Sequence, residues 1–82
     1  MSAPAPEVLI YTRRDCSLCE RMEAGVRELL GPDAGVTLVE IDDDPGLLAR
    51  FGRDVPVLCV DDEVVCRHFL DAGRLRAAFP PS

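Results

Sequence analysis

Two cysteines spaced three residues apart stand where an apparent strand gives way to a helical pattern. Val8-Leu-Ile-Tyr11 is a continuous run of β-forming residues, which predicts a buried strand. The apolar residues that follow fall on one helix face at Leu18, Met22, Val26, Leu29 and Leu30, and Gly31-Pro32 ends the pattern. Cys16-Ser-Leu-Cys19 therefore lies at a strand-to-helix junction, and this junction constrains the fold more than any other feature.

A second strand and a second helix are predicted next. Residues 36 to 41 form another short β-rich run. Asp44 as N-cap and Pro45 at the first helical position predict a helix that runs to Gly52. The adjacent carboxylates of residues 42 to 44 are interpreted as capping and solvated groups, because three neighbours in sequence do not by themselves converge on a cation.

The last third of the chain predicts a hairpin and a final helix. Residues 57 to 60 and 63 to 66 flank Asp61-Asp62, as in two antiparallel strands closed by a tight turn. Asp71 begins a helical pattern that reaches Phe79. The order β-α-β-α-β-β-α implies a right-handed parallel crossover first and a hairpin last. The predicted fold is therefore an α/β fold with a four-stranded mixed sheet flanked by helices on both faces.

Length and composition predict one folded domain. The chain has 82 residues, of which 48% are hydrophobic and 29% charged, far from the composition of disordered chains. We expect an N-terminal tail over residues 1–6, a single domain over residues 7–79 and a C-terminal tail over residues 80–82.

Charge and hydropathy narrow the expected partners and location. The net charge of −6, with arginines scattered among acids, argues against a nucleic-acid surface. The N-terminal residues resemble neither a signal peptide nor a membrane span. We therefore expect a cytoplasmic protein whose partners are other proteins or thiol metabolites.

Cysteine chemistry gives the first functional hypothesis. In the reducing cytosol, paired cysteines are usually catalytic, redox-sensing or metal-binding. At a helix start, unpaired amides and the helix dipole stabilise a Cys16 thiolate, and a Cys-x-x-Cys motif lowers the cysteine pKa from about 8.5 to roughly 3.5–7.5. Arg13 and Arg14 add positive charge, which Asp15 partly cancels. We expect Cys16 to attack a disulfide and the deeper Cys19 to resolve the mixed disulfide.

A metal site at Cys16 and Cys19 would need two more ligands. Cys59, Cys66 and His68 are the only candidates for these ligands, and all three belong to the predicted hairpin. A turn at Asp61-Asp62 places Cys59 and Cys66 diagonally on the same sheet face, whereas a turn one residue later places them directly opposite each other. We interpret them as small buried hydrophobes and His68 as a surface or packing residue.

Two segments of the chain resemble a known family. The segments "LIYTRRDCSLC" and "EIDDDPGLLARFGRDVPVLCVDD" resemble small bacterial glutaredoxin-like proteins of the thioredoxin superfamily, over roughly residues 7 to 79. The resemblance implies a nucleophilic Cys16, a resolving Cys19 and a Val55-Pro56 bond held in cis, with the Val55 backbone turned outward to pair with an extended substrate. It also implies that Arg13 binds a glutathione carboxylate. Cys66-Arg67-His68 replaces the Gly-Gly turn that glutaredoxins usually carry.

We therefore expect a thiol-disulfide oxidoreductase without a bound cofactor or metal. The expected catalytic residues are Cys16 and Cys19, and the expected substrate-binding residues are Tyr11, Arg13, Val55 and Pro56. Substrates would be protein or small-molecule disulfides, with glutathione as co-substrate or a thioredoxin-type reductase as electron source. Arg14 is interpreted as solvated charge. The alternatives are a non-catalytic redox-sensing or protein-interaction module, and a thiolate metal or iron-sulfur carrier.

Overall fold

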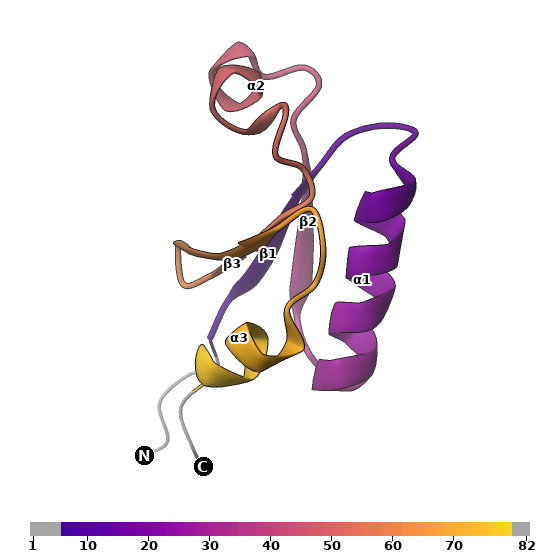
Figure 1. Ribbon diagram of the computed structural model, residues 1–82, viewed down its shortest axis with the longest axis vertical. Coiled ribbons are helices and arrows are strands. Elements are labelled where there is room, and N and C mark those ends of the chain that lie inside the picture. The colour runs from indigo at the N-terminus through magenta and orange to yellow at the C-terminus, as the bar shows by residue number, and fades with distance from the viewer. Residues whose placement is uncertain (1–5, 80–82) are drawn as a thin grey trace.

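The computed structural model describes residues 6–79 and shows the expected element order (Figure 1). The elements are β1 (Val8–Thr12), α1 (Ser17–Leu30), β2 (Val36–Glu40), α2 (Pro45–Phe51), β3 (Val57–Val60), β4 (Glu63–Arg67) and α3 (Ala72–Ala77). The predicted tails, apart from Pro6, lie outside the described residues. No helix in the part of the chain that is described has the length and apolarity to cross a bilayer.

The sheet brings two loops together at one end. Its strand order is β2-β1-β3-β4, with β1 parallel to β2 and antiparallel to β3. Tyr11, near the end of β1, pairs with Val57 at the start of β3. The residues that follow β1 and those that precede β3 therefore meet at the same edge, so the Cys16 loop lies beside Val55-Pro56. The predicted four-stranded mixed sheet is confirmed.

Helices cover both faces of this sheet, as predicted, but unequally. On one face α1 and α3 pack over the sheet, and Met22, Val26 and Leu75 are at most 2% exposed. On the other face the short α2 contributes Phe51 to a smaller cluster with Ile41 and Val57. Figure 1 shows α2 near one end of the sheet, whereas α1 runs along the length of the sheet.

Local chemistry at the helix ends and the hairpin turn follows the sequence. The Asp44 carboxylate accepts the Leu47 amide N–H, and the Asp71 carboxylate accepts the Arg74 amide N–H. Both predicted N-caps are therefore confirmed. Asp61 and Asp62 have φ values of 49° and 69°, the left-handed pair that a two-residue hairpin turn requires.

A β-bulge in the hairpin changes the side-chain pattern of β4. Cys59 pairs with Val64, but Leu58 pairs with Cys66, which leaves Val65 as the extra residue. Cys66 therefore joins the core under α1 and α3, whereas Cys59 joins the core under α2. The prediction that Cys59 and Cys66 share one sheet face is wrong, because the inserted residue shifts Cys66 to the opposite face.

The buried face of α1 also differs from the predicted stripe. Its buried residues are Cys19, Met22 and Val26, whereas Leu18 is only half-buried and Leu29 is exposed. The stripe begins one residue later than predicted because Cys16 is the N-cap and Cys19 occupies the first inward-facing position. The second cysteine of the motif is thus a core residue.

Candidate functional site: a disulfide at the start of α1

Cys16 is the N-cap of α1, and its sulfur faces the free amides of the first turn. The Cys16 Sγ accepts the Cys19 backbone N–H at 3.1 Å, as the side chain of a polar N-cap residue would. Because this amide and the positive end of the helix dipole act on the same sulfur, both stabilise a thiolate there once the bond to Cys19 is reduced.

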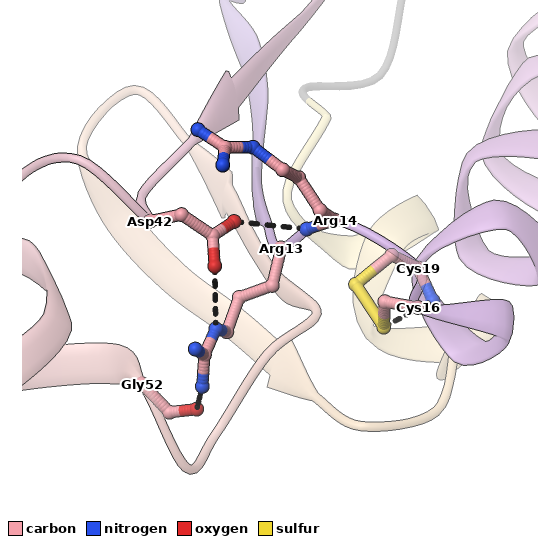
Figure 2. Close-up of a disulfide and its surroundings, with 6 residues drawn as sticks. All are labelled: Arg13, Arg14, Cys16, Cys19, Asp42 and Gly52. Carbon is pink, nitrogen blue, oxygen red and sulfur yellow. Dashed lines mark hydrogen bonds and ion pairs between the residues drawn. A yellow bond between two sulfur atoms is a disulfide. The ribbon is translucent and has the colours of Figure 1, made fainter.

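Cys16 and Cys19 form a disulfide across the first turn of the helix (Figure 2). Their Cα atoms are 5.3 Å apart, within the usual range for a disulfide. The two cysteines differ in exposure, since Cys19 is 4% exposed and Cys16 is half-buried. Of the pair, Cys16 is the sulfur that a substrate can approach.

Cys16 opens onto a broad surface hollow, which we name the Cys16 depression. It has a volume of about 500 Å³ and is lined by Arg13, Arg14, Asp15, Cys16, Ser17, Leu18, Gly52, Arg53, Val55 and His68. Its walls come from the loop after β1, the start of α1, the end of α2 and the segments that flank the hairpin. This volume lies within the range of ligand sites, about 300–1,000 Å³.

Val55 and Pro56 lie at one side of this depression. The Val55-Pro56 peptide bond is cis, as the resemblance implied. Pro56 is fully buried, and its carbonyl accepts the His68 backbone N–H at 2.8 Å. Within the described residues, neither the amide nor the carbonyl of Val55 makes a backbone hydrogen bond.

Arg13 contacts the protein itself. Its Nε lies 3.2 Å from Asp42 Oδ1, and its Nη1 donates to the Gly52 carbonyl at 3.4 Å. Figure 2 shows the Arg13 side chain directed toward Asp42 and Gly52, away from the disulfide. Arg13 thus links the loop before Cys16 to the end of α2, and a substrate carboxylate would compete with Asp42 for its guanidinium.

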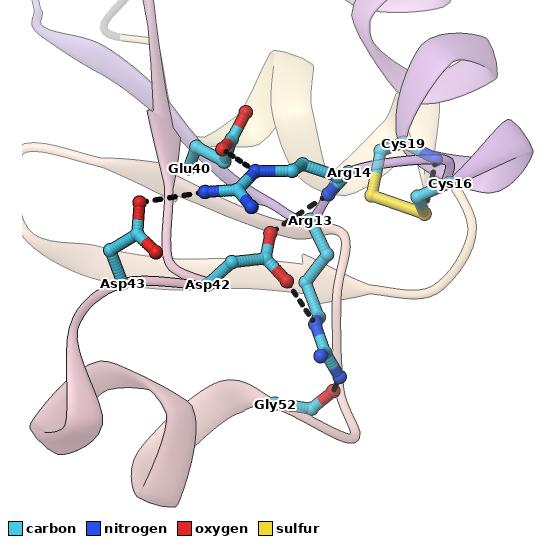
Figure 3. Close-up of polar contacts among 8 residues, drawn as sticks. All are labelled: Arg13, Arg14, Cys16, Cys19, Glu40, Asp42, Asp43 and Gly52. Carbon is cyan, nitrogen blue, oxygen red and sulfur yellow. Dashed lines mark hydrogen bonds and ion pairs between the residues drawn. A yellow bond between two sulfur atoms is a disulfide. The ribbon is translucent and has the colours of Figure 1, made fainter.

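Arg14 is held by three acidic residues (Figure 3). Its Nε lies 2.6 Å from Glu40 and its Nη2 lies 2.6 Å from Asp43, while its backbone N–H donates to Asp42 at 2.9 Å. The hydrogen bond to Glu40 is the main cause that raises the pKa of Arg14. The interpretation of Arg14 as merely solvated charge is therefore wrong.

Asp42 was missed by the sequence interpretation of the acidic run. Its carboxylate accepts both the Arg14 backbone N–H and the Arg13 Nε–H, so one side chain fixes two consecutive residues of the loop that leads to Cys16. The Arg14 amide is the largest of the contacts that lower the pKa of Asp42. A carboxylate two residues after the end of β2 could have been identified as a loop anchor, because parallel β1 and β2 end at the same sheet edge.

The structure brings together most of the expected site residues. Arg13, Cys16 and Val55 line the depression, with Cys19 and Pro56 buried behind it. Tyr11 is not at this place: it is partly buried against the core under α2, with its ring stacked on Phe51 at 4.6 Å between centroids. Arg53 and His68, which were not among the expected site residues, also line the depression.

Cys59 and Cys66 lie in a different environment. Both are free thiols, 6% and 7% exposed. Burial is the main cause that raises the pKa of each thiol. Among residues 6–79, no group of three or more His, Cys, Asp and Glu side chains is arranged to hold a metal ion.

Fold and site together define a thioredoxin-like protein with a disulfide at the N-terminus of its first helix. The family model of the Glutaredoxin-like domain (DUF836) matches residues 7–79. The chain therefore belongs to this glutaredoxin-like family.

Curated proteins and solved structures are similar over most of the chain. Uncharacterized protein Rv0508 of Mycobacterium tuberculosis is 34% identical over 79 residues, which covers 88% of this chain and 80% of that protein. The solution NMR structure of protein Ne2328 from Nitrosomonas europaea has a TM-score of 0.85 and 28% identity, with 98% of both chains covered. The X-ray structure of protein XcR50 from X. campestris has a TM-score of 0.68 and 33% identity, with 85% of this chain and 91% of that chain covered.

Proposed function

We propose that this protein is an enzyme, a thiol-disulfide oxidoreductase that uses Cys16 as nucleophile and Cys19 as resolving cysteine. The observation that carries the proposal is the asymmetry of the disulfide. Cys16 caps α1 with its sulfur on a backbone amide and borders an open depression, whereas Cys19 is 4% exposed beneath it. One sulfur is therefore stabilised as an anion and accessible, and the other is shielded.

The first step uses the reduced protein. The Cys16 thiolate attacks one sulfur of a substrate disulfide, which breaks the substrate S–S bond and forms a mixed disulfide with Cys16. The departing substrate sulfur leaves as a thiolate and takes a proton from water. The Cys19 amide N–H and the helix dipole hold the attacking thiolate at neutral pH.

The second step regenerates the disulfide seen in the structure. Cys19 loses its proton and attacks the Cys16 sulfur, which releases the second substrate thiol. Two electrons pass to the substrate, and Cys16 and Cys19 are left joined. The 5.3 Å between their Cα atoms allows this bond within one helical turn.

Val55 is proposed to hold the substrate. Its amide and carbonyl have no backbone partner within the described residues, and Val55 lines the same depression as Cys16. An extended segment that pairs with this backbone adds a short strand beside the reacting sulfur. Arg13 is proposed to meet a substrate carboxylate when it releases Asp42.

The electron source and the location complete the proposal. Reduction of the Cys16–Cys19 disulfide needs two electrons, which two glutathione molecules or a thioredoxin-type reductase would supply. Both belong to a reducing compartment, where a catalytic disulfide is reset after each turnover. We therefore propose that the protein works in the cytoplasm, with no bound prosthetic group.

Turnover of a small disulfide tests the proposal. Hydroxyethyl disulfide is supplied with NADPH and either glutathione plus glutathione reductase, or thioredoxin reductase alone. The wild-type protein should accelerate NADPH oxidation with at least one source, Cys16→Ser should fall to the uncatalysed rate, and Cys59→Ala should match the wild type. A protein that cycles between thiol and disulfide but reduces no substrate with either source would instead be a redox sensor.

A further inference from the structure

Phe69 is unusually exposed for a large aromatic side chain. It is 69% exposed, compared with 43% for Leu38, the next of the exposed large hydrophobic residues in the described chain. Two backbone hydrogen bonds hold the chain at this point. His68 takes a left-handed conformation, with φ of 65°, and donates its amide to the Pro56 carbonyl, while the Phe69 amide donates to the Arg67 carbonyl at 2.7 Å. Such non-glycine conformations cluster at functional sites.

Phe69 forms one wall of a small groove, which we name the Phe69 groove. The groove is lined by Leu18, Arg21, Met22, His68, Phe69 and Leu70 and has a volume of about 110 Å³. This is well below the roughly 300–1,000 Å³ of a site for a whole small molecule and is on the scale of one side chain. Leu18 and His68 also line the Cys16 depression, so the two hollows are contiguous.

Two arginines near these hollows lack an acidic partner. Arg13 and Arg14, by contrast, are matched by Asp42, Asp43 and Glu40. Arg21 in the Phe69 groove and Arg53 in the Cys16 depression are exposed and form no ion pair within residues 6–79. Asp15, which also lines the Cys16 depression, forms no ion pair among these residues either, so the two hollows present two unpaired arginines and one unpaired carboxylate on a chain whose net charge is −6.

We propose that the Phe69 groove selects protein substrates: a cysteine-bearing segment of a partner protein seats an apolar side chain, adjacent to its cysteine, against Phe69 and Leu18. Acidic side chains of the same segment face Arg21 and Arg53. The inference rests on the proposed function and names its substrate class. Glutathione has no apolar side chain to fill the groove, so its γ-glutamyl and glycyl groups would leave Phe69 uncovered.

Paired peptides test the apolar part of the inference. Two symmetric peptide disulfides are compared, one with leucine and the other with serine on both sides of a central cysteine. Single-turnover reduction by the pre-reduced protein is followed by chromatography and normalised to the rates with dithiothreitol. The wild-type protein should reduce the leucine peptide about tenfold faster, because filling one apolar subsite is worth about that factor.

Matched variants locate the effect. Phe69→Ala should bring the leucine-to-serine rate ratio close to one, whereas Leu38→Ala, which removes an exposed apolar side chain from β2, should keep the wild-type ratio. Because each variant is judged by its own ratio, a general change in rate does not affect the comparison. A wild-type ratio near one, a preference retained by Phe69→Ala, or one lost in Leu38→Ala would each overturn the inference.

A second pair of peptides tests the expected contacts between acidic side chains and the two arginines. Leucine-flanked peptides that end in glutamates should react a few-fold faster than those that end in lysines at low salt, and the difference should shrink as salt screens it. Arg53→Glu should reduce or reverse this preference, and an unchanged preference would refute the charge assignment. Reduction of none of the peptides would refute the proposed function itself, an outcome distinct from equal reduction of all of them.

Discussion

The four cysteines form two groups with opposite environments. Cys16 and Cys19 lie close in sequence at a helix start and share a disulfide, and Cys16 borders an open depression. Cys59 and Cys66 lie in neighbouring strands, are free and are turned to opposite cores by the bulge at Val65. Backbone placement therefore decides the chemistry of each group: free helix amides stabilise a thiolate, whereas an apolar core disfavours one.

The largest difference should appear in alkylation. In the reduced native protein at pH 7, iodoacetamide should modify Cys16 at least about 100-fold faster than Cys59 or Cys66. The helix start increases the thiolate fraction of Cys16, whereas burial raises the pKa of the other two thiols. Peptide mapping by mass spectrometry at successive times measures the three rates, and comparable rates would remove the distinction between the groups.

The second prediction concerns the resolving step. Cys19→Ser should accumulate a stable mixed disulfide between Cys16 and a substrate thiol, because no neighbouring sulfur remains to release it. Mass spectrometry of the intact protein after mixing with a peptide disulfide measures the adduct. Cys59→Ser serves as the control and should release its substrate as the wild type does. If the adduct of Cys59→Ser lasted as long as that of Cys19→Ser, Cys19 would not be the specific resolving thiol.

The third prediction concerns the stability of the hairpin core. Cys59→Ala should lower the free energy of unfolding by about 1 kcal/mol, whereas Cys59→Ser should cost about 1–3 kcal/mol, because it buries a hydroxyl in an apolar site. Chemical denaturation of both variants gives the two values. Equal costs would mean that this core tolerates a polar group and that the contrast between the cysteine groups is weaker than the fold suggests.

The sequence sufficed for the framework of this site but not for its details. Element order, the Asp44 and Asp71 caps and the Asp61-Asp62 turn follow from local chemistry, and all agree with the structure. The cis Val55-Pro56 bond came from resemblance alone.

Details that depend on long-range pairing could not be predicted in the same way. A bulge at Val65 has no local signature, so the side of the sheet that Cys66 faces was predicted wrongly. The partners of Arg14 lie 26 to 29 residues away and meet it only because β1 and β2 are parallel. The hydrogen bond from the His68 amide to the Pro56 carbonyl, next to the exposed Phe69, likewise joins two segments that only the fold brings together.

The smallest effect is expected for Asp42, the residue that anchors the loop before Cys16, on the pH dependence of unfolding. The pKa of Asp42 is lowered from its ordinary value of 3.8, mainly by the Arg14 amide. The ionised Asp42 therefore stabilises the protein fully at a pH above the pKa that it has in the unfolded chain. This stabilisation is lost as the pH falls through the lower pKa that Asp42 has in the folded protein. Between pH 6 and pH 3, the free energy of unfolding should fall more for the wild type than for Asp42→Asn.

A carboxylate from the hairpin provides the matched control for this titration. Glu63 is exposed and forms no ion pair within the described residues. Glu63→Gln should therefore leave the pH dependence of unfolding as it is in the wild type. If Asp42→Asn also leaves it unchanged, Asp42 does not anchor the loop before Cys16.

The pKa of Cys16 tests the central claim most directly. The rate of Cys16 alkylation in the reduced protein, measured as a function of pH, gives this value, and a Cys59→Ala/Cys66→Ala background removes the two thiols of the hairpin. We predict an apparent pKa clearly below that of free cysteine, because the first-turn amides of α1 stabilise the thiolate. A value of about 8.5 or above would contradict the assignment of Cys16 as the nucleophile.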